Sequence, residues 1–333
     1  MINRRVFKSV ALAALLSLSG AAVEAADFTL RLASTAAPSE DDPEYAALRV
    51  FQKEAENLSK GRIAVQIYPA NQLGGTREYT EGVSLGSIEM GNTGYDTLGT
   101  FAPVANALTM PYLHDSLEHY AAVIDSPIGQ KIHEQIAKTS GIRVLGVLYR
   151  GPRQLMTKNK EVRGPKDLSG LRIRSPETAL NAETVRAMGG TPVPLSWSEV
   201  YTALATGAVD GVENPLDVLA AAKMQEVQKY LILTRHIYLG NPLIINDAYF
   251  QKLPEDMRKA LVTAAKTAST SRIESLKTSE ARSLKAMKDA GVIIVENPDL
   301  PSFAANARAV WAKFTDGKNI TQDLLTQIKD FKP

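Results

Sequence analysis

Arginine side chains at the end of a short strand pattern are the residues of this sequence best suited to chemistry. Apolar and basic residues alternate over Leu171, Arg172, Ile173 and Arg174, so the two arginines share one side of an extended strand. A guanidinium donates two parallel hydrogen bonds to the oxygens of a carboxylate. At the mouth of a cleft, such a side chain is suited to binding an organic acid. A single arginine is more often a solvated or ion-paired surface residue, and residue type alone leaves both roles open.

Other polar residues also follow strand patterns. Arg153 comes after one of them, and Glu213 and Asn214 come directly after another. The Asn214 side chain can both donate and accept hydrogen bonds, although asparagine before proline is also a common turn residue. Trp197, at the start of a predicted helix, offers an apolar wall to a ligand or an ordinary core contact.

Catalytic and metal-binding patterns do not compete with these candidates. The chain has no cysteine, and its four histidines include no pair at the i,i+4 spacing that places two ligands on one helical face. Its paired glycines lack the spacing of a dinucleotide or phosphate loop. We therefore expect no metal and no cofactor. An enzyme that used Glu213 as a catalytic base would also need an acid paired with it, and the sequence supplies none. We therefore do not expect the protein to be an enzyme.

Residues 1–26 have the order of a secretory signal peptide. Basic residues come first, a short apolar run over 10–18 follows, and Val23-Glu24-Ala25 offers a cleavage site of small residues near Ala25-Ala26. The pair Arg4-Arg5 also approaches a twin-arginine signal, so the export route stays open. These features predict a periplasmic protein.

Removal of that segment would leave 35 basic and 35 acidic residues, a formally neutral chain. A neutral chain lacks the basic surplus of a nucleic-acid-binding protein. About 300 residues can bury a sizeable core without disulfides and predict about two domains.

Alternating strand and helix patterns predict an α/β fold. The mature chain opens with a strand over 28–32, a helix over 42–58 with Asp42 as N-cap and Pro43 as its first residue, and a strand over 63–67. A strand–helix–strand unit builds a mostly parallel sheet.

The same pattern recurs in the second half of the chain. A strand ends at Arg174, a helix starts at Ser175-Pro176, and Ser196 and Glu199 are spaced as a capping box for a further helix. Residues 260–287 form a long run of helix formers that could bridge two lobes. The segments 78–89 and 199–210 repeat a helix that stops at glycine and continues into a strand, which suggests two lobes of like construction.

At this point the sequence resembles a known family, the solute-binding proteins of TRAP (tripartite ATP-independent periplasmic) transporters, over essentially the whole mature chain. The stretches that carry the resemblance are Pro69–Gly75, Asp167–Arg174, Gly190–Pro194, Glu199–Leu204 and Val209–Pro215. It implies a two-lobe periplasmic-binding-protein fold, with mixed, mostly parallel sheets flanked by helices, a hinge and a long helix spanning both lobes. We expect lobe I over 27–150 plus 239–278, and lobe II over 151–238 plus 279–333.

The resemblance also implies roles for individual residues. The family's carboxylate-clamping arginine falls on Arg174 and its assisting arginine on Arg153, its ring-packing aromatic falls on Trp197 and its ligand-binding asparagine on Asn214. Glu213 precedes Asn214 and is expected at the same ligand site. We expect Ser34 and the segment that holds Asn92 and Tyr95 to bind the rest of the ligand.

The substrate is less constrained. Gly94 stands where sialic-acid-binding members have an acidic residue, and Asn92 to Thr97 holds no basic residue, so we do not expect a sialate. A sugar acid or other hydroxy carboxylate is the favoured ligand, with a C4-dicarboxylate or an ectoine-like zwitterion as alternatives. The expected partner is a membrane permease driven by an ion gradient, although a ligand sensor that docks on a receptor would use the same surface. We expect a monomer.

Overall fold

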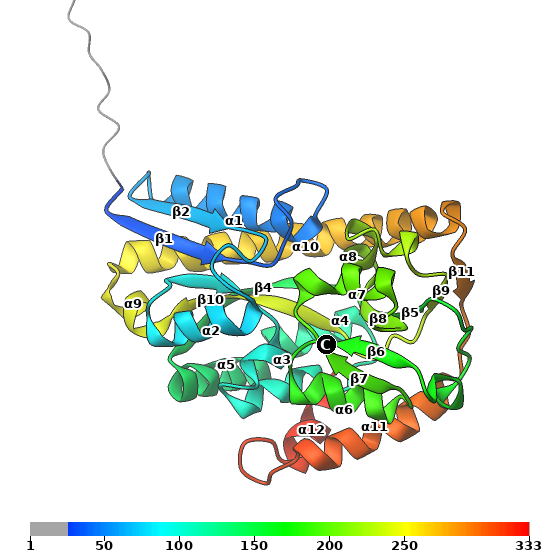
Figure 1. The fold of residues 1–333 in the computed structure, drawn as a ribbon. Coiled ribbons are helices and arrows are strands. Elements are labelled where there is room, and N and C mark those ends of the chain that lie inside the picture. Colours follow the sequence, from blue (N-terminus) through cyan, green and yellow to red (C-terminus); the bar gives the residue numbers. More distant parts are fainter. Residues whose placement is uncertain (1–25, 333) are drawn as a thin grey trace, which may run out of the picture.

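Two β-sheets organise the chain, and a computed structural model describes it over residues 26–332 (Figure 1). The predicted signal peptide therefore lies outside the described residues, apart from Ala26. The first sheet has the order β2-β1-β3-β10-β4 and the second β11-β9-β5-β8-β6-β7. The first consists of β1 (Phe28–Ala33), β2 (Ile63–Tyr68), β3 (Met90–Asn92), β4 (Ile142–Arg150) and β10 (Leu239–Asn246). The second consists of β5 (Arg153–Thr157), β6 (Arg172–Ser175), β7 (Thr191–Pro194), β8 (Gly211–Pro215), β9 (Tyr230–Ile232) and β11 (Ile293–Val295).

Both sheets are mixed. Strands β2, β1 and β3 run parallel, whereas β10 is antiparallel to β3 and β4. In the second sheet, β7, β6 and β8 are parallel and β5 is antiparallel to β8 and β9. Each sheet with its helices is called a lobe below, the first lobe holding β1 and the second holding β6.

Helices cover both faces of each sheet. They are α1 (Pro43–Leu58), α2 (Thr76–Leu85), α3 (Tyr95–Leu98), α4 (Leu117–Asp125), α5 (Pro127–Ser140), α6 (Ala179–Ala187), α7 (Val200–Thr206), α8 (Leu216–Ala221), α9 (Asp247–Lys252), α10 (Glu255–Asp289), α11 (Leu300–Phe314) and α12 (Gln322–Lys329). Leu48 and Phe51 of α1 and Leu261 of α10 pack on one face of the first sheet, while α3, α4 and α5 pack on the other. In the second lobe, α7 and α8 cover one face and α6 and α11 the other (Figure 1). Among the described residues, no helix combines the length and the hydropathy of a membrane span.

The chain passes between the lobes at four places, the last of them between α11 and α12. Strand β4 leads directly into β5, β9 leads back into β10, and the amide of Arg153 donates to the carbonyl of Ile237 (2.8 Å), which ties the first two crossings together. The third crossing is α10, whose Ala264 packs in the first lobe and whose Met287 packs in the second. With 35 residues, this helix is longer than the predicted run and is about 52 Å in length.

The residue boundaries expected for the two lobes stay a prediction, and one feature of the packing differs from them. Helix α12, which that division places in lobe II, buries Leu325 and Ile328 in the core of the first lobe. His119 of α4 lies against it, with Nε2 at 3.0 Å from the carbonyl of Ile328. The last helix therefore returns to the first lobe.

Local signals in the sequence produced most of these elements. Asp42 caps α1 by accepting from the amides of Glu44 and Tyr45, as predicted. The repeated helix-to-strand unit is present twice, because α2 and α7 both end at a glycine with positive φ, Gly86 (79°) and Gly207 (75°).

Two local predictions were wrong. The capping box at Ser196 and Glu199 does not form, since Ser196 makes no cap hydrogen bond and a short 3-10 turn precedes α7. Helix α6 begins at Ala179 with Thr178 as its N-cap, and not at Ser175-Pro176. In both places the chain first lines a cavity between the lobes, through residues 176–178 and 195–197.

A buried histidine in the first lobe makes the stability of the fold sensitive to acid. His114 lies 3.1 Å through Nε2 from the carbonyl of Leu108, so Nε2 carries the proton and Nδ1 is bare, with no partner among the described residues. Burial, and then the nearby His119, lower the pKa of His114 to about 3. Protonating Nδ1 would bury an unpaired charge.

Because the unfolded state binds this proton near pH 6.5 and the folded state near pH 3, stability is lost as the pH falls through that window. We expect the free energy of unfolding to fall by about 2 kcal/mol between pH 7 and pH 5 from His114 alone. Urea unfolding at both values, for the wild type and His114→Gln, measures it. Between pH 7 and pH 5, the free energy of unfolding of the variant should fall by about 2 kcal/mol less than that of the wild type. Equal decreases in the two proteins would contradict the role given to His114.

Candidate functional site

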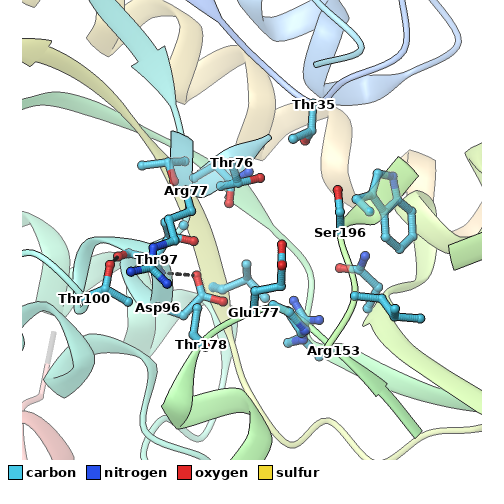
Figure 2. Close-up of a pocket in the computed structure, with 18 of the residues that line it drawn as sticks. Thr35, Thr76, Arg77, Asp96, Thr97, Thr100, Arg153, Glu177, Thr178 and Ser196 are labelled. Carbon is cyan, nitrogen blue, oxygen red and sulfur yellow. Dashed lines mark hydrogen bonds between the residues drawn. The ribbon is translucent and has the colours of Figure 1, made fainter. Parts of the chain in front are cut away.

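A cavity lies between the lobes, at the ends of strands from both sheets. Its lining includes Thr35, Thr76 and Asp96 from the first lobe, and Arg174, Glu177 and Trp197 from the second. Figure 2 shows the side chains of Asp96, Glu177 and Arg153 around the same open space. Ligands in open α/β sheets bind at this position, outside the carboxyl ends of strands.

Arg174 is the central basic residue of this lining. It lies on β6, with parallel partners on both sides, and is 4% exposed. Nε and Nη2 both donate to the carbonyl of Leu195 (3.0 and 2.7 Å), and the guanidinium lies 5.3 Å from the ring centre of Trp197. Within the described chain, Nη1 makes no hydrogen bond and no carboxylate pairs with this side chain. The edge formed by Nη1 and the second Nη2 hydrogen is the edge that can bind a carboxylate.

The environment of Arg174 favours an anion. Burial lowers the pKa of Arg174 to about 10, and the neighbouring Arg153 adds to that effect. The charges of Glu213, Asp96 and Glu177 oppose this effect, and the side chain remains cationic at neutral pH. None of these carboxylates forms an ion pair with Arg174, so its charge is held away from water without a direct partner. A bound anion would supply that partner.

Arg153 takes part in a buried network at the base of the cavity. Its guanidinium pairs with the Glu213 carboxylate, with Nη2 at 2.7 Å from Oε1, and donates to the Glu213 carbonyl at 2.8 Å. His236 contacts the same carboxylate through Nε2 (3.1 Å) and the Thr234 hydroxyl through Nδ1 (2.8 Å). All four residues are buried.

Opposing effects set the charges in this network. Burial by itself would raise the pKa of Glu213, but the charge of Arg153 and the hydrogen bonds from His236 and Arg153 lower it to about 2. Burial lowers the pKa of His236, so the imidazole is neutral at pH 7 and donates from Nε2. Glu213 thus holds Arg153 in place at the cavity floor and does not itself line the cavity.

The residues singled out from the sequence divide into two groups. Arg174, Arg153, Trp197 and Asn214 line one cavity, and the amide oxygen of Asn214 is buried without a partner among the described residues. The other four, Ser34, Asn92, Tyr95 and Glu213, lie behind the lining.

Those behind the lining have structural contacts of their own. Ser34 accepts from the amide of Ala36, and Asn92 donates to the backbone carbonyl of Asn241, which fastens β3 to β10. The Tyr95 hydroxyl lies 2.6 Å from His133 Nε2. Their immediate neighbours Thr35, Thr93, Gly94 and Asp96 line the cavity instead. Residues adjacent to the predicted ones therefore line the cavity, and ligand contact by the predicted residues stays a prediction.

Several lining residues were not among the predicted site residues. Arg150, at the end of β4, lies 3.6 Å through Nη1 from Glu44, whose carboxylate also accepts from Asn241 (2.7 Å). Its position three residues before Arg153 in the same segment was the available signal. Asp96, Glu177 and Thr178 each begin or precede a short helix after a strand, a place that polar residues occupy for many reasons.

Over residues 26–332, no three histidine or acidic side chains gather as a metal site would require. Two α/β lobes joined by crossing strands, with a buried guanidinium facing the cavity between them, define the class of bilobal solute-binding proteins.

The chain belongs to the bacterial extracellular solute-binding proteins of family 7, the solute-binding proteins of TRAP transporters, whose family model matches residues 33–318. It is 31% identical over 315 residues to the sialic acid-binding periplasmic protein of Vibrio cholerae, covering 95% of this chain and 96% of that protein.

Two solved structures of TRAP periplasmic solute-binding proteins share the fold. One, from Roseobacter denitrificans with bound L-galactonate, is 32% identical with a TM-score of 0.84 and covers 91% of this chain and 99% of its own. The other, from a Polaromonas species with bound D-erythronate, is 29% identical with a TM-score of 0.86 and covers 92% and 99%. The predicted family and fold are confirmed.

Proposed function

We propose that this chain captures a sugar acid in the cavity between its lobes and delivers it to a TRAP permease. The observation that carries this proposal is Arg174, a buried cation with no carboxylate partner in the described chain and a free guanidinium edge at the cavity. The ligand carboxylate binds that edge, and Arg153 assists from the cavity floor. The similarity to proteins with bound L-galactonate and D-erythronate supports a polyhydroxy acid.

Polar side chains around the rest of the cavity suit hydroxyl groups. Thr35, Thr76, Thr178 and Ser196 provide hydroxyls that donate and accept, and Asn214 provides an amide. Trp197 packs against the Arg174 guanidinium and offers an apolar surface to the ligand. A ligand that touches both lobes stabilises the closed arrangement, and the permease recognises the closed form.

The family membership and the sequence of residues 1–26 support a periplasmic setting for this activity. We infer export to the periplasm with cleavage near Ala25-Ala26, uptake driven by an ion gradient, and a monomeric binding protein. An enzymatic role is disfavoured, because Glu213, the candidate base, is held by Arg153 with its pKa at about 2. A carboxylate of such low pKa is a weak base at neutral pH.

A ligand panel tests the proposal directly. The mature protein is heated with aldonates, uronates, sialate, C4-dicarboxylates and ectoine, and its melting temperature is recorded. A ligand that binds only the folded state at a hundred times its Kd adds about 2.7 kcal/mol of stability. We expect a clear increase with aldonates or uronates and none with sialate or ectoine, and calorimetry then gives Kd. An increase confined to dicarboxylates or ectoine would contradict a sugar acid as ligand.

A further inference from the structure

The Asp96 carboxylate faces the cavity from the first lobe, opposite the second lobe that holds Arg174. Asp96 is the second residue of α3, and the cavity lining includes it (Figure 2). Oδ1 accepts from the amide of Thr97 (2.9 Å), and Oδ2 accepts from Nδ2 of Asn181 in the second lobe (2.5 Å). Gly94 makes room for this arrangement, because a Cβ there would lie 2.1 Å from Oδ1.

This carboxylate retains acceptor capacity toward the cavity. A carboxylate has about four lone-pair sites, and the two hydrogen bonds within the protein use two of them. Asp96 is half-buried and forms no ion pair in the described chain. It therefore presents a negative charge and free acceptors, which favour a hydroxyl donor and disfavour a second ligand carboxylate.

The charges around the cavity agree with a ligand that carries one carboxylate. Arg153 is paired with Glu213 and Arg150 lies beside Glu44, so each already has an acidic neighbour. Arg174 is the buried cation of the lining that forms no ion pair within the described residues, although the charges of Glu213, Asp96 and Glu177 act on it from farther away. One buried, unpaired cation corresponds to one ligand carboxylate.

Two other charged residues, Arg77 and Glu177, also line the cavity. Glu177 adds a second negative charge to the same lining. Arg77 is exposed to solvent, where water and salt screen its charge.

We propose that Asp96 determines the substrate class of this site: it accepts hydrogen bonds from the hydroxyl end of a monocarboxylate sugar acid and excludes acids with a carboxylate at both ends. This inference rests on the proposed function, because it assumes that Arg174 binds the first carboxylate. Within the class, it favours aldonates over the aldarates of the same configuration.

The test compares galactonate with galactarate, which share their hydroxyl configuration and differ in the second carboxylate. Calorimetry gives both Kd values for the wild type, Asp96→Asn and two controls. We expect the wild type to prefer galactonate at least tenfold. In Asp96→Asn, galactonate should weaken about tenfold to a hundredfold, the range of a charge-assisted hydrogen bond, while galactarate is unchanged or tighter.

The two control variants distinguish an effect of Asp96 on ligand specificity from an effect of the contact between the lobes. Asn181→Ala removes the interlobe hydrogen bond but keeps the carboxylate, so both ligands should weaken alike and the ratio should persist. Glu177→Gln removes another lining charge and should change the ratio less than Asp96→Asn does.

Each failure has its own signature. A wild type that binds galactarate as tightly as galactonate, or an Asp96→Asn variant that keeps the wild-type ratio within twofold, overturns the role of Asp96 and leaves the proposed function intact. A wild type that binds no sugar acid overturns both. If a variant does not fold, the ratio of the wild-type Kd values for galactarate and galactonate still tests the proposal.

Discussion

Replacing Arg174 with alanine is expected to abolish most ligand binding while leaving the protein folded. Truncating one partner of a buried, hydrogen-bonded charge pair costs about 2–5 kcal/mol, which is roughly a thirtyfold to several-thousandfold increase in Kd. Much of that loss arises because the ligand carboxylate would be buried without a cation. Calorimetry on the mature variant, with the ligand identified in the panel, measures it.

The folded state should tolerate this change because the protein partner of Arg174 is the carbonyl of Leu195, which water can satisfy once the side chain is gone. Arg172→Ala is the matched control, since Arg172 lies two residues earlier on β6 with 46% of its side chain exposed and pairs with Asp210. That variant should bind normally. Arg174→Lys keeps the positive charge but not the planar guanidinium. Its affinity for the ligand should lie between those of the wild type and Arg174→Ala. Affinity within threefold of wild type in Arg174→Ala would contradict the carboxylate-binding role.

Breaking the buried ion pair between Asp217 and Arg272 is expected to cost about 3–5 kcal/mol of unfolding free energy. Arg272 lies in the middle of α10, and Asp217 is the second residue of α8 in the second lobe. Their side chains are 1% and 2% exposed. Either single change, Asp217→Leu or Arg272→Met, leaves one charge buried without a partner. Urea unfolding of both single variants measures the cost.

The double variant distinguishes a buried charge from a loss of packing. Since replacing a buried ion pair by apolar residues is often neutral or stabilising, Asp217→Leu with Arg272→Met should recover most of the stability lost by either change. Lys285→Met, which breaks an exposed pair with Asp289 on the same helix, should cost less than about 1 kcal/mol. Additive losses in the double variant would show that the two side chains act independently.

The sequence by itself determined the elements whose signals are local. The Asp42 N-cap, the glycine that ends α7 and the alternation in β1 each depend on residues within one or two turns of the chain. Their conformational preferences act before distant contacts form, so the order of strands and helices was readable without a structure. The internal repeat already suggested two lobes, and the family resemblance supported them and added the expected role of Arg174.

Only the tertiary structure decided which side chains reach the cavity. The period of two places Arg172 and Arg174 on the same side of β6, yet Arg172 pairs with Asp210 at the surface and Arg174 lies in the cavity. The same holds in segment 92–96, where Asp96 lines the cavity and Asn92, four residues earlier, fastens two strands. The contacts of a side chain at the end of a strand depend on which residues of the other lobe pack against it.

Long-range packing also decided the charges. Glu213 is an acidic residue before a turn in the sequence, but burial beside Arg153 and His236 makes it a fixed counter-ion. Arg174 forms no such ion pair among the described residues, and the fold brings the carbonyl of Leu195 to its guanidinium instead. Residue type fixes which charges a chain carries, whereas burial and distance, which depend on segments far apart in the sequence, decide which of them remain available to a ligand.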